Sequence, residues 1–285
     1  MRVLVSGARG LLGAAVVREF SRDHDVLALD RSSLDVTDTA AIAATVADAA
    51  PGVIINCAAY NHVDQAEDEP AKALAVNAFG ALALAQAAER AGAVFVHYSS
   101  DFVFDGETDR PYTEPDKANP RGVYAASKLL GDMFALEYER AYVLRVESLF
   151  GPPGPDAARR GSLGSIVDQI RSGSQVNVFT DRVVSPTYTP DIARATRALI
   201  ERDVPRGLYH CVNTGMATWE QIAQRAADIM GMTLRANPIT LATVNLKARR
   251  PRFCAMSNRK IVAAGIPMPA WQDALVEFIE SAPRT

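Results

Sequence analysis

Short apolar segments alternate with longer amphipathic segments along the first 150 residues. The apolar segments have strand length and show no polar alternation, which is typical of strands covered on both faces. In the longer segments, apolar residues recur at helical spacing. The pattern predicts strands at residues 2–6, 25–30, 53–56, 94–99 and 143–146, and helices at residues 11–20, 39–50, 71–91 and 124–138.

This alternation predicts βαβ units, because parallel strands need crossover connections that are usually helical. We therefore expect an α/β fold over residues 1–150, with a doubly wound parallel sheet and helices on both faces. Ligands of such sheets bind outside the carboxyl ends of the strands. Polar residues that follow the predicted strands are thus the first candidates for a functional site.

The pattern is less regular after residue 150. Residues 151–164 are rich in Gly and Pro and predict a surface loop. Helices are predicted at 165–171, 191–201, 218–230 and 270–280, and strands at 176–179 and 208–212. We expect residues 151–285 to form mainly a smaller C-terminal α/β substrate lobe at the carboxyl edge of the sheet. Parts of 175–205 are expected to return to the first domain.

The composition is that of an ordinary globular protein, with 48% hydrophobic and 22% charged residues. A net charge of -3 gives no basic excess, so a nucleic-acid partner is not expected. Three scattered cysteines predict free thiols in a reducing compartment, and no metal site is expected. Neither a signal peptide nor an apolar run of about 18 residues is found, so we expect a cytoplasmic protein without a membrane partner. The oligomeric state stays open, a homodimer included.

Three glycines follow the first predicted strand at G-x-x-G-x-x-G spacing, with Gly7, Gly10 and Gly13 opening the first predicted helix. Such glycines allow a tight turn, a close approach of the backbone to a pyrophosphate, and helix–sheet packing. The helix N-terminus adds unpaired N–H groups and a positive dipole end. A Rossmann-type dinucleotide site is therefore predicted, although glycines that merely break the strand–helix turn remain the alternative. Its expected residues here are Gly7, Arg9, Gly10, Leu11, Leu12 and Gly13.

The nature of the cofactor depends on the end of the second predicted strand. Asp30 lies there and can accept hydrogen bonds from the ribose hydroxyls of NADH. Arg31 beside it, and Arg9 in the glycine loop, can instead meet the 2′-phosphate of NADPH. The sequence leaves both cofactors open.

Tyr124 and Lys128 are four residues apart, which puts them on one face of a predicted helix. A free tyrosine has a pKa of about 10, and a nearby ammonium is expected to lower it. The pair predicts a general acid for a carbonyl oxygen, with the lysine also holding a ribose; an exposed surface pair is the alternative. Ser99 and Ser100 end the fourth predicted strand, where a hydroxyl can donate to a developing oxyanion.

Together these residues resemble the extended short-chain dehydrogenase/reductase superfamily, and more narrowly the dTDP-4-dehydrorhamnose reductase family. The similarity extends over nearly the whole chain. It includes the glycine loop, Asn56-Cys-Ala-Ala-Tyr60, the HYSSDFVFDG stretch at 97–106, Tyr124 with Lys128, Ser185-Pro-Thr-Tyr188, Gly207-Leu-Tyr-His210 and Arg250-Pro251.

The resemblance implies a reductase that uses NADPH or NADH on the C4 carbonyl of a nucleotide-activated 4-keto-6-deoxy sugar. Ser100 takes the place of the family's catalytic threonine, Tyr124 would donate the proton, and Lys128 would be its electrostatic partner. The resemblance places Asp35 and Val36 at the adenine and Ala58, Ala59 and Tyr60 beside the cofactor, together with Ser99 and Lys128. The nucleotide diphosphate would lie in the smaller lobe.

Three departures leave the sugar undefined. Phe102 stands where the family often has a tyrosine, Glu147 stands in a segment that often reads R-T-S-W, and Gln65 replaces a common lysine. Phe102 also lacks the carboxylate that related dehydratases use, so dehydration is not expected. The substrate-side candidates are His62, Ser100, Phe102, Tyr124, Glu147 and Arg250.

Arg250 belongs to the densest basic cluster, with Arg249 and Arg252. A solvated patch is one interpretation and a diphosphate clamp the other, because guanidinium groups match phosphate oxygens. The resemblance favours the clamp, chiefly for Arg250.

Two further functions stay open. An epimerase, or a reductase of another ketosugar, would use the same cofactor site. A non-catalytic regulatory subunit of a methionine adenosyltransferase would use the fold as a binding module, although the intact set of Ser100, Tyr124 and Lys128 weighs against it.

Overall fold

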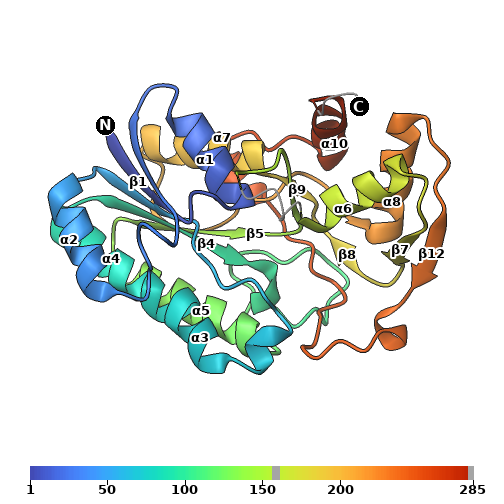
Figure 1. Ribbon diagram of the computed structural model, residues 1–285, viewed down its shortest axis with the longest axis horizontal. Helices are drawn as coiled ribbons and strands as arrows, with labels where there is room; N and C mark the ends of the chain where they lie inside the picture. Colours follow the sequence, from blue (N-terminus) through green and yellow to red (C-terminus); the bar gives the residue numbers. More distant parts are fainter. Residues whose placement is uncertain (156–160, 282–285) are drawn as a thin grey trace.

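A six-stranded parallel sheet forms the centre of the molecule, in the order β10-β5-β4-β3-β1-β2. The structure is a computed structural model and describes residues 1–155 and 161–281 (Figure 1). The strands are β1 (Arg2–Ser6), β2 (Asp25–Leu29), β3 (Val53–Asn56), β4 (Val94–Ser100), β5 (Ala141–Val146) and β10 (Gly207–His210). The chain order reverses between β1 and β3, and this switch point is where ligands bind in open α/β sheets. The predicted doubly wound sheet is confirmed.

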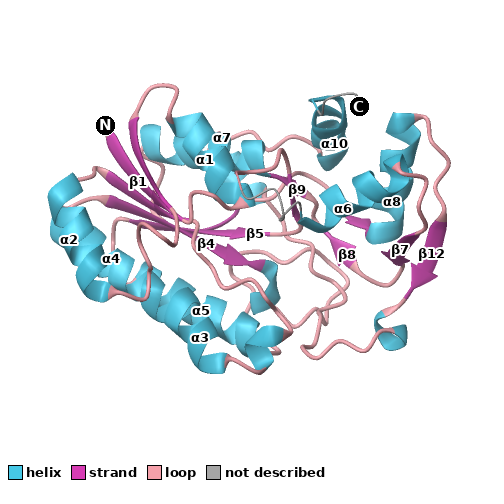
Figure 2. Ribbon diagram, viewed as in Figure 1, coloured by secondary structure: helices cyan, strands magenta, loops and turns pink. Residues whose placement is uncertain are grey.

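Helices cover both faces of the sheet, which explains why its central strands are apolar at nearly every position (Figure 2). On one face lie α1 (Leu11–Phe20) and α7 (Thr189–Glu201), which pack against each other. On the other lie α2 (Thr39–Ala49), α4 (Gly80–Ala91) and α5 (Val123–Leu136). Each face has its own buried apolar core.

A smaller lobe lies beyond the carboxyl end of β5 (Figure 1). Its helices are α6 (Gly161–Arg171), α8 (Trp219–Met230) and α10 (Trp271–Ser281), and β7 (Val176–Phe179) pairs in parallel with β12 (Ala236–Ile239). Trp219 and Trp271 are buried in its core. Thr218 begins α8 with a capping box, because its hydroxyl accepts from the Gln221 N–H and its own N–H donates to the Gln221 side chain.

Short elements complete the fold. The helical ones are η1 (Gln65–Glu67), α3 (Pro70–Leu74), η2 (Ala75–Phe79), η3 (Asp101–Val103), η4 (Leu241–Thr243) and α9 (Arg259–Ala263). The extended ones are β6 (Leu149–Phe150), β8 (Val183–Val184), β9 (Thr187–Tyr188) and β11 (Ala217–Thr218). Of the predicted loop 151–164, residues 156–160 lie outside the described residues, and the prediction is wrong for 161–164, where α6 has begun.

Residues beyond 150 contribute to both parts of the molecule. α7 and β10 join the layers of the central sheet, and β10 lies after residue 205. β7, which falls within 175–205, pairs with β12 in the smaller lobe instead. Within residues 175–205, α7 is therefore the element that joins the first domain, because its apolar stripe packs on α1.

The continuous helical stretch Pro70–Ala91 is long and apolar enough to cross a membrane by composition alone. Its most apolar window is 56% buried within the molecule, because α4 packs on α2 and α5. Partial burial of this kind is typical of a helix that covers a sheet.

Candidate active site

A cavity of about 410 Å³ lies at the carboxyl edge of the sheet, next to the β1–β3 switch point. The start of α1, the loop after β3, the end of β4, one face of α5 and the segment after β5 all contribute to it. Its lining residues are Gly10, Leu11, Leu12, Gly13, Cys57, Ala58, Ala59, Asn61, Val63, Tyr98, Ser99, Ser100, Asp101, Phe102, Tyr124, Lys128, Val146, Glu147, Ser148, Leu149, Gly161 and Ser162.

The glycine loop has the geometry that a pyrophosphate requires. Gly7 has a φ of 68°, and a Cβ on Gly13 would lie 2.2 Å from the Gly7 carbonyl oxygen, so the turn and the helix start tolerate no side chain at these positions. Gly10 begins α1 without a side-chain cap, and the first turn holds no acidic residue. The first N–H groups of a helix have no partner within it, so those of α1 are available to an anion in the cavity. A dinucleotide pyrophosphate fits this donor set.

The Asp30 carboxylate is held by its own turn. Its Oδ1 accepts hydrogen bonds from the backbone N–H and the hydroxyl of both Ser32 and Ser33, at 2.6–3.0 Å. These hydrogen bonds, led by that of the Ser32 hydroxyl, lower the pKa of Asp30 to about 2. Asp30 is therefore a firmly ionised acceptor, but one oxygen is already committed to its neighbours.

Two arginines flank this turn. The Arg9 Nε lies 3.7 Å from Asp30 Oδ2, and the Arg31 Nε lies 3.5 Å from Asp35 Oδ2. The Arg9 and Arg31 side chains are 48% and 79% exposed. Val36 is buried. None of these five residues lines the cavity, so the predicted adenine and ribose contacts lie outside it.

In the loop after β3, some residues line the cavity and others hold the loop in place. Ala58 and Ala59 line the cavity, whereas Tyr60 does not. The Tyr60 N–H donates to Asn77 Oδ1 at 2.8 Å, and its hydroxyl donates to Glu69 Oε2 at 2.6 Å. Tyr60 thus fixes the loop to the helices beneath it rather than facing the cofactor site.

Tyr124 and Lys128 lie on one face of α5, as predicted, and both line the cavity although they are only 8% and 2% exposed. The Tyr124 hydroxyl lies 3.5 Å from Asn61 Oδ1, and the Phe102 ring packs edge-on against the phenol. The Lys128 Nζ donates to the Tyr98 carbonyl oxygen at 2.6 Å. Burial lowers the pKa of Lys128 to about 8.

The expected acidification of Tyr124 is wrong. Burial and the Asp101 carboxylate raise the pKa of the phenol above its ordinary value, and Lys128 is not among the groups that shift it. The reason is geometric, because the ammonium turns to the Tyr98 carbonyl oxygen instead. Tyr124 therefore stays protonated at neutral pH, which is the state of a proton donor.

Ser100 lies where β4 ends and η3 begins. Its hydroxyl donates to Asp101 Oδ1 at 2.8 Å and accepts from the Phe102 N–H at 3.2 Å. Ser99 is also buried and lines the cavity. Both serines line the same cavity as Tyr124, as their place at the strand end predicts, and the Ser100 hydroxyl is the one that acts on the phenol.

The substrate-side candidates do not all meet in this cavity. Phe102 and Glu147 line it, and Glu147 is 2% exposed. His62 is exposed and packs edge-on against the Tyr60 ring at 5.6 Å. Arg250 lines a second cavity and its guanidinium lies 5.8 Å from the Phe102 ring centre.

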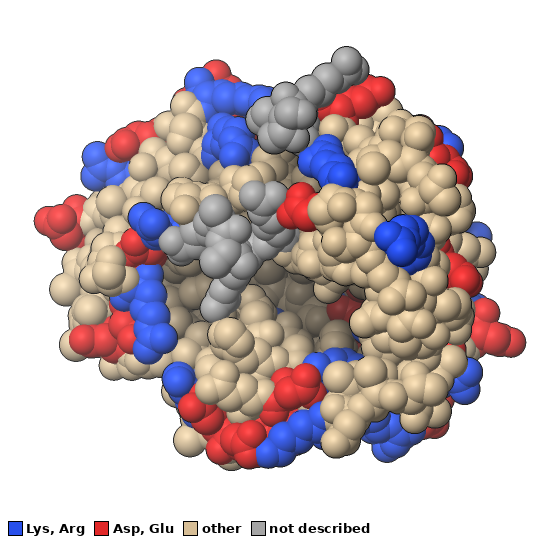
Figure 3. All heavy atoms as spheres, turned by 45° about the vertical axis from the view of Figure 1, so that its right-hand side comes forward, with Lys and Arg blue, Asp and Glu red and all other residues tan. Residues whose placement is uncertain are grey.

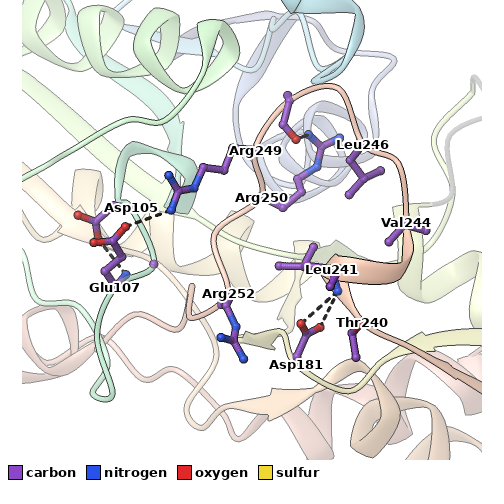
Figure 4. A pocket seen from close by; sticks show the side chains of 13 residues that line it. Asp105, Glu107, Asp181, Thr240, Leu241, Val244, Leu246, Arg249, Arg250 and Arg252 are labelled. Carbon is purple, nitrogen blue, oxygen red and sulfur yellow. Dashed lines mark hydrogen bonds and ion pairs between the residues drawn. The ribbon is translucent and has the colours of Figure 1, made fainter.

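That second cavity has a volume of about 630 Å³ and lies between the first domain and the smaller lobe (Figure 4). Arg250 donates to Asp64 Oδ2 at 2.7 Å, and Arg249 to Glu107 Oε1 at 3.2 Å. Arg252 lies on the same loop segment as Arg249 and Arg250. It makes no hydrogen bond or ion pair with the other residues drawn (Figure 4). Figure 3 shows that one face of the molecule is hollowed, with basic and acidic side chains mixed around the hollow.

Several lining residues were not foreseen. Asp101 directly follows Ser100 at the end of β4, and Asn61 follows the predicted residue Tyr60 in the loop after β3, so their sequence neighbours indicate both positions. Ser148 directly follows Glu147 after β5, whereas Gly161 and Ser162 begin α6, and nothing in the local sequence of these two indicates a site.

Comparisons with known proteins agree on one family. The family model described as "RmlD substrate binding domain" matches residues 1–283. A dTDP-4-dehydrorhamnose reductase of Streptomyces griseus is 37% identical over 97% of this chain and 92% of its own, and the spore coat polysaccharide biosynthesis protein SpsK of Bacillus subtilis is 31% identical over 98% and 97%. The structure of dTDP-4-dehydrorhamnose reductase from Bacillus anthracis, in complex with NADP, is 30% identical, covers 99% of both chains and superposes with a TM-score of 0.92.

Proposed function

The chain belongs to the RmlD substrate-binding-domain family, and from that premise we propose that it reduces the C4 carbonyl of dTDP-4-dehydrorhamnose or a closely related nucleotide-activated 4-keto-6-deoxy sugar. It is an NAD(P)-dependent oxidoreductase of the extended short-chain dehydrogenase/reductase superfamily. One observation carries the proposal. Ser100, Tyr124 and Lys128 line the same cavity as the first turn of α1.

The residues at this cavity fit a nicotinamide dinucleotide. Gly10, Leu11, Leu12 and Gly13 would receive the pyrophosphate, and Ala58 and Ala59 would border the cofactor. Lys128, held by the Tyr98 carbonyl oxygen, would reach the nicotinamide ribose. NAD(P)H, when bound, supplies the hydride.

The proton comes from the protein. Tyr124 is buried, protonated and directed toward the cavity, so its hydroxyl donates to the carbonyl oxygen that becomes the product's new hydroxyl. The Ser100 hydroxyl lies beside it and stabilises the same oxygen as negative charge develops. The Lys128 ammonium holds a positive charge in the cavity at neutral pH, which favours the developing anion.

Two arginines support NADPH as the preferred cofactor. Arg9 and Arg31 flank the Asp30 turn with exposed guanidinium groups, which match a 2′-phosphate. The Asp30 carboxylate is partly consumed by Ser32 and Ser33, which weakens it as an acceptor for ribose hydroxyls.

The nucleotide diphosphate of the substrate would lie in the second cavity. Arg249, Arg250 and Arg252 present three guanidinium groups there, within a space large enough for a nucleotide (Figure 4). Arg250 also stacks near Phe102, which lines the first cavity, so it lies between the two spaces. Binding energy from the diphosphate would then hold the sugar carbonyl at Tyr124.

The test is turnover by the purified chain with NADPH and dTDP-4-dehydrorhamnose. We expect NADPH oxidation with one equivalent of reduced sugar, and its near loss in Tyr124→Phe. Tyr138→Phe is the matched control, because Tyr138 is buried but its hydroxyl donates to the Ala93 carbonyl oxygen, which is not part of the cavity. Sugar conversion without net NADPH oxidation would indicate an epimerase. Stoichiometric capture of a methionine adenosyltransferase without turnover would indicate a regulatory subunit.

A further inference from the structure

Two carboxyl groups meet at the wall of the cavity because of strand register. Ser100 at the end of β4 is paired with Val146 at the end of β5, so the residues that follow, Asp101 and Glu147, emerge side by side. Carboxylate oxygens of both, and the Cys254 Sγ, lie within 4.8 Å of one another. Asp101 and Glu147 are 5% and 2% exposed, and both line the cavity.

The two acids have few donors. Glu147 Oε2 accepts from the Ser185 N–H at 2.8 Å, and within the described residues no donor reaches Glu147 Oε1. Asp101 Oδ1 accepts from the Ser100 hydroxyl. Buried carboxylates normally satisfy both oxygens, so an unpaired Oε1 close to a second carboxyl group favours one protonated acid in the pair.

Arg182 acts on both acids. Among the described residues, this cation lowers the pKa of Asp101 and of Glu147. Its Nε donates to the Pro251 carbonyl oxygen at 3.2 Å and its Nη2 contacts the Cys254 Sγ at 3.5 Å. Two ionised carboxylates and one guanidinium would leave a net negative charge on two largely buried carboxyl groups, which is costly.

Protonation removes that cost. Burial, followed by the neighbouring acid, raises the pKa of Glu147 well above its ordinary value, and burial raises that of Asp101 to about 6. Burial also raises the pKa of the Cys254 thiol, and a neutral thiol is a poor metal ligand. The Tyr124 phenol on α5 also faces the pair, since the Asp101 charge acts on it.

We propose that Asp101 and Glu147 share one proton at neutral pH, and that this proton replaces the one that Tyr124 gives to the substrate, by way of the Ser100 hydroxyl. The second part of the proposal, the transfer of the proton to Tyr124 by way of Ser100, rests on the proposed function. The shared proton itself does not depend on it.

The transfer is balanced. When Tyr124 has protonated the product oxygen, the Ser100 O–H bond breaks as its proton passes to the phenolate. A new Ser100 O–H bond forms with the proton from Asp101, whose carboxyl group becomes a carboxylate. In this structure the Ser100 hydroxyl donates to Asp101 Oδ1 at 2.8 Å, so it must first turn its hydrogen to the phenolate; Asp101 is then within reach of the Ser100 oxygen for the second transfer. The cavity that both acids line gives solvent access for recharging the pair. Asp101 and Glu147 therefore do not contact the reacting atoms; they act on them through Ser100 and Tyr124.

The shared proton is tested directly by infrared difference spectroscopy at pH 7. We expect a carboxylic-acid C=O band in the wild-type chain that is absent in Glu147→Gln, because the amide donates to Asp101 and removes the like charge that keeps its proton. The Glu280→Gln variant, on the exposed end of α10, should keep the band. A wild-type spectrum without such a band, or a band that survives in Glu147→Gln and in Asp101→Asn, overturns the proposal.

The relay is tested by the pH profile of kcat. The Glu147→Gln variant should lose activity at lower pH than the wild type, with kcat reduced about tenfold at pH 7.5, a small part of a general acid's usual effect, and with KM unchanged. Glu147→Asp, which keeps a carboxyl group, should restore part of the rate. A uniform loss of rate with an unmoved pH profile would overturn the relay. A wild-type chain that reduces no ketosugar would refute the proposed function, and the infrared result would still decide the shared proton.

Discussion

The Lys128 Nζ donates a hydrogen bond to the Tyr98 carbonyl oxygen at 2.6 Å, and this contact determines what the lysine can do. The ammonium is anchored at the end of β4 by this contact, although Lys128 and Tyr124 both lie on α5 and line the same cavity. Lys128 therefore holds a positive charge in the cavity, while Tyr124 keeps its proton until the reaction needs it.

Replacing Tyr124 with phenylalanine should lower kcat by roughly 10²–10⁴-fold, the usual contribution of a general acid. The ring packing against Phe102 should be kept, so the melting temperature should change little. Steady-state NADPH oxidation and thermal unfolding measure the two quantities. A variant with unchanged kcat would contradict the assignment of Tyr124 as the proton donor.

Activity should fall as the pH rises through about 8. The pKa of Lys128 is lowered to about 8 by burial, so the ammonium is charged below that pH and loses its proton above it. Loss of the charge should weaken cofactor binding and anion stabilisation together. The Lys128→Met variant should be slow at every pH and should lack this alkaline step in a kcat/KM profile, whereas a wild-type profile that is flat to pH 9 would contradict the role of the charge.

Arg31→Ala and Arg9→Ala should each raise the KM for NADPH roughly tenfold, the size of a charge-assisted hydrogen bond, and leave the KM for NADH nearly unchanged. The 2′-phosphate is the one group that differs between the two cofactors. Initial rates with both cofactors measure the effect. Arg22→Ala is the control, because Arg22 is also exposed and pairs with Glu19 on α1. An equal rise in KM for NADPH and for NADH would show that the arginines do not bind the 2′-phosphate.

Gly13→Ala should destabilise the fold by roughly 1–3 kcal/mol, the usual cost of overpacking, and should abolish cofactor binding. Its Cβ would lie 2.2 Å from the Gly7 carbonyl oxygen, so the loop and the helix start must separate. Gly52→Ala is the control, because the nearest atoms to its added Cβ lie 3.9 Å away. Chemical denaturation and fluorescence titration with NADPH measure the outcome. Native-like binding by Gly13→Ala would contradict the close packing of this turn.

Arg252→Ala and Arg249→Ala should raise the KM for the nucleotide sugar several-fold and leave kcat nearly unchanged, because they are expected to contact the diphosphate and not the reacting carbon. Arg250→Ala should have a larger effect, since it also breaks the contact with Asp64 that joins the lobe to the loop after β3. Asp64→Asn separates these two contributions by loosening that contact while keeping the guanidinium. If all three arginine variants keep the wild-type KM, the substrate diphosphate lies elsewhere.

The sequence by itself determined the sheet, the glycine loop and the relation of Tyr124 to Lys128. These follow from local periodicity, from the backbone freedom of glycine and from helical spacing, all of which act within a few residues. The ends of the predicted strands likewise placed Ser99 and Ser100 at the cavity.

Tertiary structure decided what these residues touch. The position of the Lys128 ammonium on α5 depends on the Tyr98 carbonyl oxygen of β4, and the raised pKa of Tyr124 depends on burial and on Asp101. The meeting of Asp101 with Glu147 depends on the β4–β5 register, and the contact of Arg250 with Asp64 joins residues far apart in the chain. Electrostatic effects depend on distance and solvent exposure across the folded chain, which no local pattern of residues specifies.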